Sequence, residues 1–117
     1  LYIKCLRIVI VVDELAEIIQ FGSIQENLIR FSAKARACGI HLILSTQRPC
    51  AKIFLARLKS DIKTRFALTT VSQYDSRIIL EEGGAEQLLS NGDMLLLNET
   101  RIKRLHCGYL DADFIES

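Results

Sequence analysis

Two adjacent carboxylates, Asp13 and Glu14, directly follow the apolar run 8–12, Ile-Val-Ile-Val-Val. Five β-branched residues in a row favour a central parallel strand that is covered on both faces, and open α/β sheets bind ligands at the carboxyl ends of such strands. In nucleotide hydrolases this arrangement lets one acid hold Mg²⁺ while a neighbouring group orients water. Nucleotide hydrolysis is therefore the leading hypothesis, with Asp13 on the metal ion and Glu14 polarising the water. The alternative is a core strand followed by an acidic first helical turn, which the helix dipole also favours.

A second polar segment, Ser45-Thr46-Gln47-Arg48-Pro49, ends the apolar run 40–45. If the two runs form parallel strands, their carboxyl ends lie at one edge of a sheet. An amide such as that of Gln47 can donate to a phosphate oxygen and accept from water in one geometry, so this segment could contact a γ-phosphate or its attacking water. The alternative is an ordinary cap between strand and loop.

The elements that must position these segments are predicted from periodicity and capping signals. Ser23, with an acidic residue three positions on, predicts a capping box for a helix over 23–38, and Gly39 stands where a left-handed C-cap belongs. Strands over 8–12 and 40–45 flank this helix, which predicts a parallel βαβ unit. The other expected elements are a short helix over 15–20, a helix over 51–59, a strand over 63–71, a helix over 75–80, a helical turn over 85–89 and strands over 94–97 and 103–109.

Length and composition fit a globular protein. The chain has 117 residues, of which 50% are hydrophobic and 25% are charged, so it can bury a real core and is not predicted to be disordered. No apolar run is long enough to cross a bilayer and no signal-peptide pattern occurs, which predicts a cytoplasmic location. The four cysteines lack zinc-site spacing and are interpreted as reduced thiols. Without a repeat or a linker, the chain is expected to form one structural unit.

The net charge of +1 conceals a strong asymmetry along the chain. Between Arg30 and Arg65 there are nine basic residues and one acidic residue, whereas six acids and one arginine lie between Asp75 and Glu99. A basic middle beside an acidic third predicts contact with a polyanion, possibly DNA. The alternative is an ordinary mixture of solvated helix faces.

Several segments, in order and with their mutual spacing, resemble the motor domain of the FtsK/SpoIIIE family of double-stranded DNA translocases. The resemblance covers nearly the whole chain and is carried by Val-Asp-Glu-Leu-Ala at 12–16, Lys-Ala-Arg-Ala-Cys-Gly-Ile-His-Leu-Ile-Leu at 34–44, Ser-Thr-Gln-Arg-Pro at 45–49, Asp-Ser-Arg at 75–77 and Gly-Gly-Ala-Glu-Gln-Leu-Leu-Ser-Asn-Gly-Asp-Met-Leu at 83–95. It implies a RecA-like P-loop NTPase core of the α/β class, with a mainly parallel sheet flanked by helices. It also implies a hexameric ring around duplex DNA, with ATP bound between subunits.

The resemblance implies roles for single residues. Asp13 and Glu14 match the Walker B acids, with Asp13 on Mg²⁺, and Gln47 matches the sensor of the γ-phosphate. Arg36 matches an arginine finger that reaches the ATP site of the neighbouring subunit, where it would stabilise transition-state charge. Without the resemblance, Arg36 would be read as a solvated residue at a helix C-terminus. Two further positions, Arg48 and Lys59, match residues that face DNA, and contacts there should be to phosphates.

The chain departs from the family pattern at several places. Gln73 stands where the family usually has a lysine, and Lys52 and Lys63 stand where an acid and a proline are common. No G-x-x-x-x-G-K-[ST] phosphate loop occurs. Residues 1–117 therefore match the C-terminal portion of a motor domain, from Walker B onward, without the Walker A portion or the winged-helix module. The chain alone is expected to bind ATP weakly and to hydrolyse none.

Three functional readings stay open. The first is an ATP-driven DNA pump that serves chromosome segregation in cell division, sporulation or mobile-element transfer, in a protein anchored at the cell membrane through regions outside these residues. The second is a conjugation or secretion coupling ATPase of the same superfamily. The third is a catalytically dead module for DNA binding or ring assembly, which the missing phosphate loop suggests.

Overall fold

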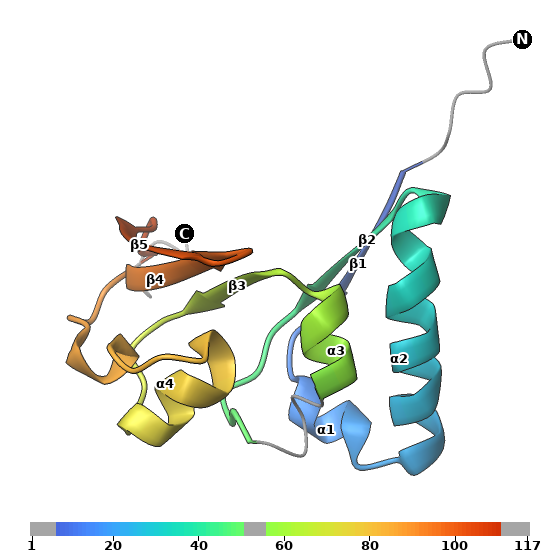
Figure 1. Cartoon of the computed structure of the whole chain (residues 1–117), viewed down its shortest axis with the longest axis horizontal. Coiled ribbons are helices and arrows are strands. Elements are labelled where there is room, and N and C mark those ends of the chain that lie inside the picture. The colour runs from blue at the N-terminus through green and yellow to red at the C-terminus, as the bar shows by residue number, and fades with distance from the viewer. Residues whose placement is uncertain (1–6, 51–55, 111–117) are drawn as a thin grey trace, which may run out of the picture. The chain divides into compact units, whose positions relative to one another are not determined.

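The fold divides into two compact units in a computed structural model that describes residues 7–50 and 56–110 (Figure 1). The first unit is Leu1–Ile62 and the second is Lys63–Ser117. The sequence analysis expected one structural unit. No cluster of glycine, proline or serine marks the boundary, so the sequence carries no linker signal there.

A parallel strand pair organises the first unit. In chain order its elements are β1 (Ile8–Val12), α1 (Leu15–Ile19), α2 (Gly22–Ala35), the 3-10 turn η1 (Arg36–Cys38), β2 (Ile40–Leu44) and α3 (Ala56–Asp61). β1 and β2 pair in register from Ile8 opposite Ile40 to Val12 opposite Leu44. The predicted βαβ unit is thereby confirmed. The start of the helix expected over 51–59 lies outside the described residues, as does Lys52.

Of the two capping signals predicted for α2, the one at its C-terminal end is confirmed and the one at its N-terminal end is wrong. Gly39 adopts the left-handed conformation (φ 73°) that was predicted for the C-cap, where a residue with a Cβ atom would be strained. The capping box at Ser23 is wrong. The amides of Ile24 and Gln25 bond to the carbonyl oxygen of Phe21, so the helix begins at Gly22 and Ser23 already lies within its first turn. The helix ends at Ala35 and continues as η1.

The core of the first unit lies beneath one face of the strand pair. Leu15, Ile19 and Leu58 are buried, and Val12 and Leu44 pack against them in part. β1 itself is mostly exposed, with Ile8 to Val11 between 37% and 65% accessible, so burial on both faces is wrong for the described part of the chain. Apolar composition predicts that a strand will be covered, but it does not say which segment supplies the cover.

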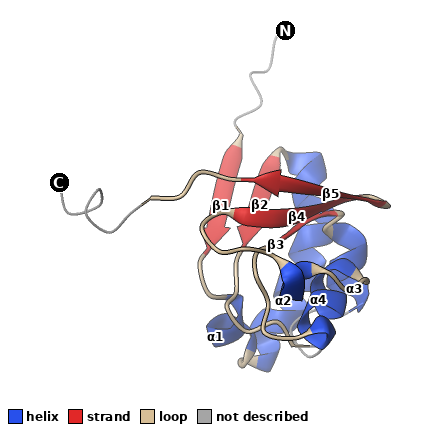
Figure 2. Ribbon diagram, turned by 90° about the vertical axis from the view of Figure 1, so that its left-hand side faces the viewer, coloured by secondary structure: helices blue, strands red, loops and turns tan. Residues whose placement is uncertain are grey.

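The second unit is built on an antiparallel sheet (Figure 2). Its elements are β3 (Thr64–Ala67), α4 (Gln73–Leu80), the 3-10 turn η2 (Ala85–Gln87), β4 (Asp93–Asn98) and β5 (Arg101–His106). β4 pairs antiparallel with both β3 and β5. The α/β class is confirmed, but the expected mainly parallel sheet is wrong for the described strands. Only two residues join β4 to β5, and so short a connection can join only antiparallel neighbours.

Helix α4 closes the core of the second unit. The buried residues are Ala67, Leu80, Ala85, Leu88 and Leu97. Ser76 is fully buried, and its hydroxyl donates to the carbonyl oxygen of Glu82 (2.8 Å) and accepts from the amide of Ala85 (3.1 Å). This hydroxyl fixes the turn around Gly83 and Gly84, because buried polar groups require partners.

The Asp93 carboxylate joins the two strands of the β4–β5 hairpin and also bonds to the turn before β4. Arg104 donates to both carboxylate oxygens of Asp93, at 2.9 and 2.6 Å, and the amide of Leu89 donates to Asp93 at 2.7 Å. The hydrogen bonds from Arg104 and Leu89 lower the pKa of Asp93 from 3.8 to about 2. The carboxylate therefore stabilises the folded second unit in its ionised form.

Truncation of Leu80 tests the core of the second unit. Leu80 is 1% exposed, so we expect Leu80→Ala to lower the free energy of unfolding by about 2–5 kcal/mol through lost burial and a cavity. Leu89, which is 70% exposed, provides the matched control. Leu89→Ala should change the free energy of unfolding by less than about 0.5 kcal/mol. Urea denaturation followed by circular dichroism measures both, and equal effects would contradict the assigned core.

The Asp93–Arg104 pair predicts a defined pH dependence. Because the pKa of Asp93 falls on folding, its contribution is complete above the unfolded pKa of 3.8 and is lost as the pH falls through about 2. We expect Asp93→Asn to lower the urea midpoint near neutral pH, and the difference from wild type to shrink steadily below pH 3.8. Glu82→Gln, at an exposed position, is the control. A difference that does not depend on pH would rule out the ion pair as its source.

Candidate functional site

Two backbone hydrogen bonds bring the polar segments after β1 and β2 together. The amide of Ser45 donates to the carbonyl oxygen of Val12, and the amide of Leu15 donates to the carbonyl oxygen of Ser45, both at 2.8 Å. These bonds extend the parallel ladder past the strand ends and hold residues 13–14 beside residues 45–47. The structure therefore places both predicted segments at one edge of the strand pair.

The Glu14 carboxylate is the best-connected group at this edge. One oxygen, Oε1, accepts a short hydrogen bond from the Thr46 hydroxyl and another from the amide of Ala16 at 3.1 Å. The other oxygen, Oε2, accepts from the amide of Gln47 at 2.9 Å. Glu14 is also the N-cap residue of α1 and has an extended backbone. A carboxylate side chain at this position satisfies an otherwise unpaired helix amide.

These contacts stabilise the charged form of Glu14. The hydrogen bond from Thr46, followed by that from the amide of Gln47, lowers the pKa of the Glu14 carboxyl below its ordinary value of 4.5. The group is therefore ionised near neutral pH, and it can accept a further hydrogen bond but cannot donate one.

Asp13 has the exposure and the chemistry of a metal ligand. Its side chain is exposed at the end of β1, and within the described part of the chain it has no hydrogen bond or ion pair. No group of three or more histidine, cysteine, aspartate or glutamate residues among the described positions could hold a metal ion by itself. Mg²⁺ is usually bound by one or two carboxylates together with substrate phosphates and water, so Asp13 fits a nucleotide-bound Mg²⁺.

The other predicted site residues lie in different places. The side chains of Gln47 and Arg48 are exposed beside Glu14. Arg36 is exposed on η1, which precedes β2 and therefore lies at the opposite end of the strand pair. Lys59 lies half-buried on α3, which packs against α2. The structure brings Asp13, Glu14 and Gln47 to one edge and does not bring Arg36 there.

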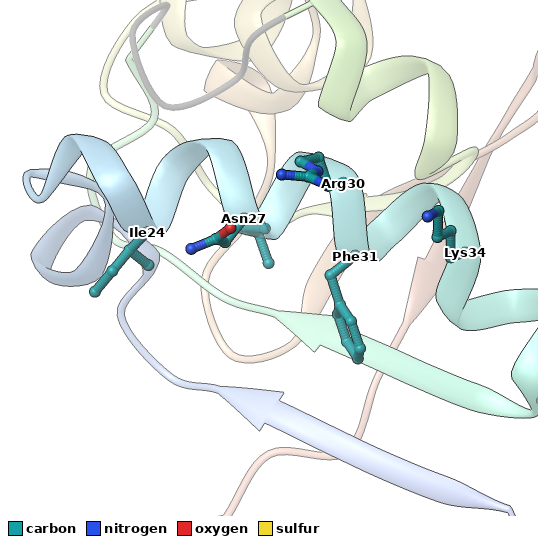
Figure 3. A pocket seen from close by; sticks show the side chains of 6 residues that line it. Ile24, Asn27, Arg30, Phe31 and Lys34 are labelled. Carbon is teal, nitrogen blue, oxygen red and sulfur yellow. The ribbon is translucent and has the colours of Figure 1, made fainter.

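Part of the basic stretch lies along α2. Arg30 and Lys34 project from this helix, and they line a shallow hollow together with Ile24, Asn27, Leu28 and Phe31 (Figure 3). Among the described residues of the first unit, the basic side chains of this stretch are thus split among helix α2, η1, the segment after β2 and α3. Arg65 instead pairs with Glu81 in the second unit, at 3.0 Å.

Two side-chain contacts were missed by the sequence analysis. Thr46 was noted for its polar chemistry, but its hydrogen bond to Glu14 was not predicted. The sequence did contain a signal for this contact, because Thr46 follows the end of β2 by two residues and β2 was predicted to run parallel to β1. The side chain of Gln73 packs against Gly83, where an added Cβ atom would approach within 2.7 Å of the amide nitrogen. That contact gives Gln73 a structural role at the start of α4.

Known proteins resemble this chain in sequence and in structure. It is 44% identical over 114 residues to DNA translocase FtsK of Haemophilus influenzae, covering 94% of this chain and 22% of that protein. It is 42% identical over 113 residues to DNA translocase SpoIIIE of Bacillus subtilis, covering 93% of this chain and 14% of that protein. The chain thus spans about a fifth or less of the length of these relatives. No protein-family model matches it.

Two solved structures share the fold. One is the pCW3 conjugation coupling protein TcpA, in monomer form with ATPgS, with a TM-score of 0.82 and 27% identity over 92% of this chain and 34% of that one. The other is the cytoplasmic domain of the Thermomonospora curvata type VII secretion ATPase EccC, with a TM-score of 0.79 and 27% identity over 88% of this chain and 12% of that one.

The fold and the acidic edge define a class of protein, an α/β domain of the kind found in those two structures. The sequence identities to FtsK and SpoIIIE then assign the family. Over the residues that match, the chain belongs to the FtsK/SpoIIIE family of DNA translocases. No described helix has both the length and the apolar character needed to span a membrane.

The Glu14 contacts predict a measurable titration. We expect the pKa of the Glu14 carboxyl, followed by carbon-13 NMR, to lie below 4.5, and Thr46→Val to move it upward because the hydrogen bond that lowers this pKa most is lost. Thr46→Ser keeps the hydroxyl and should leave the midpoint low. Thr100→Val, at an exposed position in the β4–β5 turn, is the control and should have no effect. A midpoint that is the same in the valine and serine variants would contradict the assigned contact.

Proposed function

We propose that residues 1–117 form part of the RecA-like motor domain of an ATP-driven double-stranded DNA translocase. The observation that carries this proposal is the hydrogen-bonded Glu14 carboxylate beside Asp13 and Gln47, at the shared edge of two parallel strands. The relatives at 42–44% identity are named DNA translocases, which supports the same class of activity here.

The acidic edge suits nucleotide hydrolysis. Asp13, exposed and unpaired among the described residues, would hold Mg²⁺. The metal ion would neutralise charge on the β- and γ-phosphate oxygens of ATP. Glu14 has one acceptor position left on Oε2, with which it would orient and polarise the attacking water. The exposed amide of Gln47 would contact the γ-phosphate.

The position of Arg36 supports a site shared between subunits. Arg36 precedes β2, whereas Glu14 follows β1, so the two are separated by the length of a five-residue strand, about 16 Å. Arg36 would therefore act on the nucleotide of a neighbouring copy, as an arginine finger supplied in trans. A closed ring, hexameric in this proposal, satisfies that requirement for every subunit.

Arg48 and Lys59 would contact DNA phosphates in the central pore of that ring. Contacts of this kind set affinity and its salt dependence without reading base sequence. The chain contains no G-x-x-x-x-G-K-[ST] loop, so the 117 residues alone are proposed to hydrolyse no ATP. We place the motor in the cytoplasm, in a membrane-anchored protein that serves chromosome partition in cell division.

The second candidate is a conjugation or secretion coupling ATPase. The likeness to TcpA and EccC in solved structures favours it, because both proteins are named for transfer rather than for chromosome segregation. Sequence identity favours the DNA translocase, at 42–44% against 27%. The third reading, a dead module for DNA binding or ring assembly, differs from both in predicting no hydrolysis in any context.

A chimera tests the proposal directly. The matched segment of the full-length Haemophilus influenzae FtsK is replaced by this chain, and steady-state ATP hydrolysis is measured with and without duplex DNA. We expect strong stimulation by duplex DNA. Glu14→Gln should lower the rate by about 10²–10⁴-fold through loss of the group that polarises water. Arg36→Ala should lower the DNA-stimulated rate by about 10³-fold through loss of the finger.

Mixing distinguishes a shared site from a damaged one. Arg36→Ala and Glu14→Gln subunits combined in one ring should recover part of the rate, because each supplies what the other lacks. Arg101→Ala, an exposed arginine on β5, is the matched control and should retain the rate. A folded chimera that hydrolyses no ATP would overturn the motor assignment. ATP hydrolysis that does not respond to duplex DNA would favour the secretion ATPase. ATP turnover by the 117-residue chain alone would contradict its proposed inactivity.

A further inference from the structure

We propose that the Thr46 hydroxyl couples the segment after β2 to Glu14, so that a polyanion bound at Arg48 sets the orientation of the Glu14 carboxylate. This inference rests on the proposed function of Glu14 as the group that polarises water. It assigns Thr46 as a positioning residue, and it gives the chain a physical route by which DNA contact could control hydrolysis.

An unbroken series of hydrogen bonds connects Arg48 with Glu14. The backbone amide of Arg48 donates to Thr46 Oγ1 at 3.2 Å, and the same hydroxyl donates its single proton to Glu14 Oε1. A hydroxyl can accept one hydrogen bond while it donates another. The Thr46 hydroxyl therefore accepts from Arg48 and donates to Glu14. The intervening residue, Gln47, donates its amide to Glu14 Oε2 at 2.9 Å.

The arrangement fixes which carboxylate oxygen can receive water. Each oxygen has about two acceptor positions. Oε1 uses both, for Thr46 and the amide of Ala16, whereas Oε2 uses one, for the amide of Gln47. Loss of the Thr46 bond would free a position on Oε1, while the amides of Ala16 and Gln47 would still hold one oxygen each, so water could then approach either oxygen. The Thr46 hydroxyl therefore leaves Oε2 as the oxygen that can receive water.

In the series of hydrogen bonds from Arg48 to Glu14, the Glu14 end is anchored to the core and the Arg48 end is exposed. Glu14 is followed by Leu15, which is 1% exposed in the core, and the amide of Leu15 is bonded to the carbonyl oxygen of Ser45. Gln47 and Arg48 are exposed on the segment that leads to Pro49. At 3.2 Å the bond from Arg48 to Thr46 is at the long end of the N–H to oxygen range. A phosphate that holds the Arg48 side chain would act first on this bond.

The decisive experiment uses three variants in the full-length chimera. Thr46→Val removes the hydroxyl and keeps the shape of the side chain, Thr46→Ser keeps the hydroxyl, and Thr100→Val controls for the substitution itself. We expect Thr46→Val to lower the DNA-stimulated kcat by about tenfold or more, with the ratio of rates with and without DNA falling toward one. The KM for ATP should change less than about twofold, because Thr46 acts on Glu14 rather than on the nucleotide. Thr46→Ser should keep most of the stimulation.

A second measurement does not depend on ATP hydrolysis. In the 117-residue chain, amide hydrogen exchange of Ala16 and Gln47 reports on the Glu14 carboxylate, because both amides donate to it. Thr46→Val should speed exchange at both amides, whereas Thr46→Ser and Thr100→Val should not. Unchanged exchange, or DNA stimulation that survives in the valine variant, overturns the coupling. A folded parent chimera that hydrolyses no ATP overturns the proposed function instead, while exchange still decides whether Thr46 positions Glu14.

Discussion

The parallel pairing of β1 and β2 is the constraint on which the candidate site depends. Two segments 32 residues apart in the chain, at Glu14 and Thr46, meet because the strands run in the same direction and stay in register to Val12 and Leu44. A shift of one residue would turn every side chain of the shifted strand to the other face of the sheet and would move the two strand ends out of step. The crossover through α2 enforces this direction, since parallel strands cannot be joined by a tight turn.

Backbone hydrogen bonds hold most of this edge in place. The ladder continues past β2 through the amide of Ser45, and the carbonyl oxygen of the same residue receives the amide of Leu15. Because the main chain is bonded on both sides, the carboxylate of Glu14 meets amides whose positions are already fixed. Such preorganised donors stabilise an anion without further rearrangement. Two of the three hydrogen bonds on Glu14 thus come from the backbone amides of Ala16 and Gln47, and the Thr46 side chain supplies the third.

Sequence patterns predicted most helices and strands of both units, and they failed where the outcome depends on packing between distant segments or on competing backbone groups. The run 8–12, the left-handed Gly39 and the βαβ connection depend on local patterns or on the rule that a helical crossover joins parallel strands, and all three are confirmed. The site edge followed from the same rule. The exposure of β1 and the Asp93–Arg104 pair could not be predicted, because each depends on which distant segments pack together. Ser23 is not the cap because the carbonyl oxygen of Phe21 accepts the first helix hydrogen bonds, from the amides of Ile24 and Gln25. The helix therefore begins before the serine.

The hydrogen bonds on Glu14 impose a compromise between basicity and orientation. They lower the pKa of the carboxyl, so the group is a weaker proton acceptor than an ordinary glutamate. A residue that had to remove a proton from water by basicity alone would be better served by an apolar pocket, which raises a carboxyl pKa. Polarising and orienting water makes a different demand, namely a permanently charged acceptor with one lone pair in a fixed direction. In the proposed site the charged Glu14 carboxylate would meet that demand, with Thr46 as its positioning residue next to the residues exposed on the segment after β2.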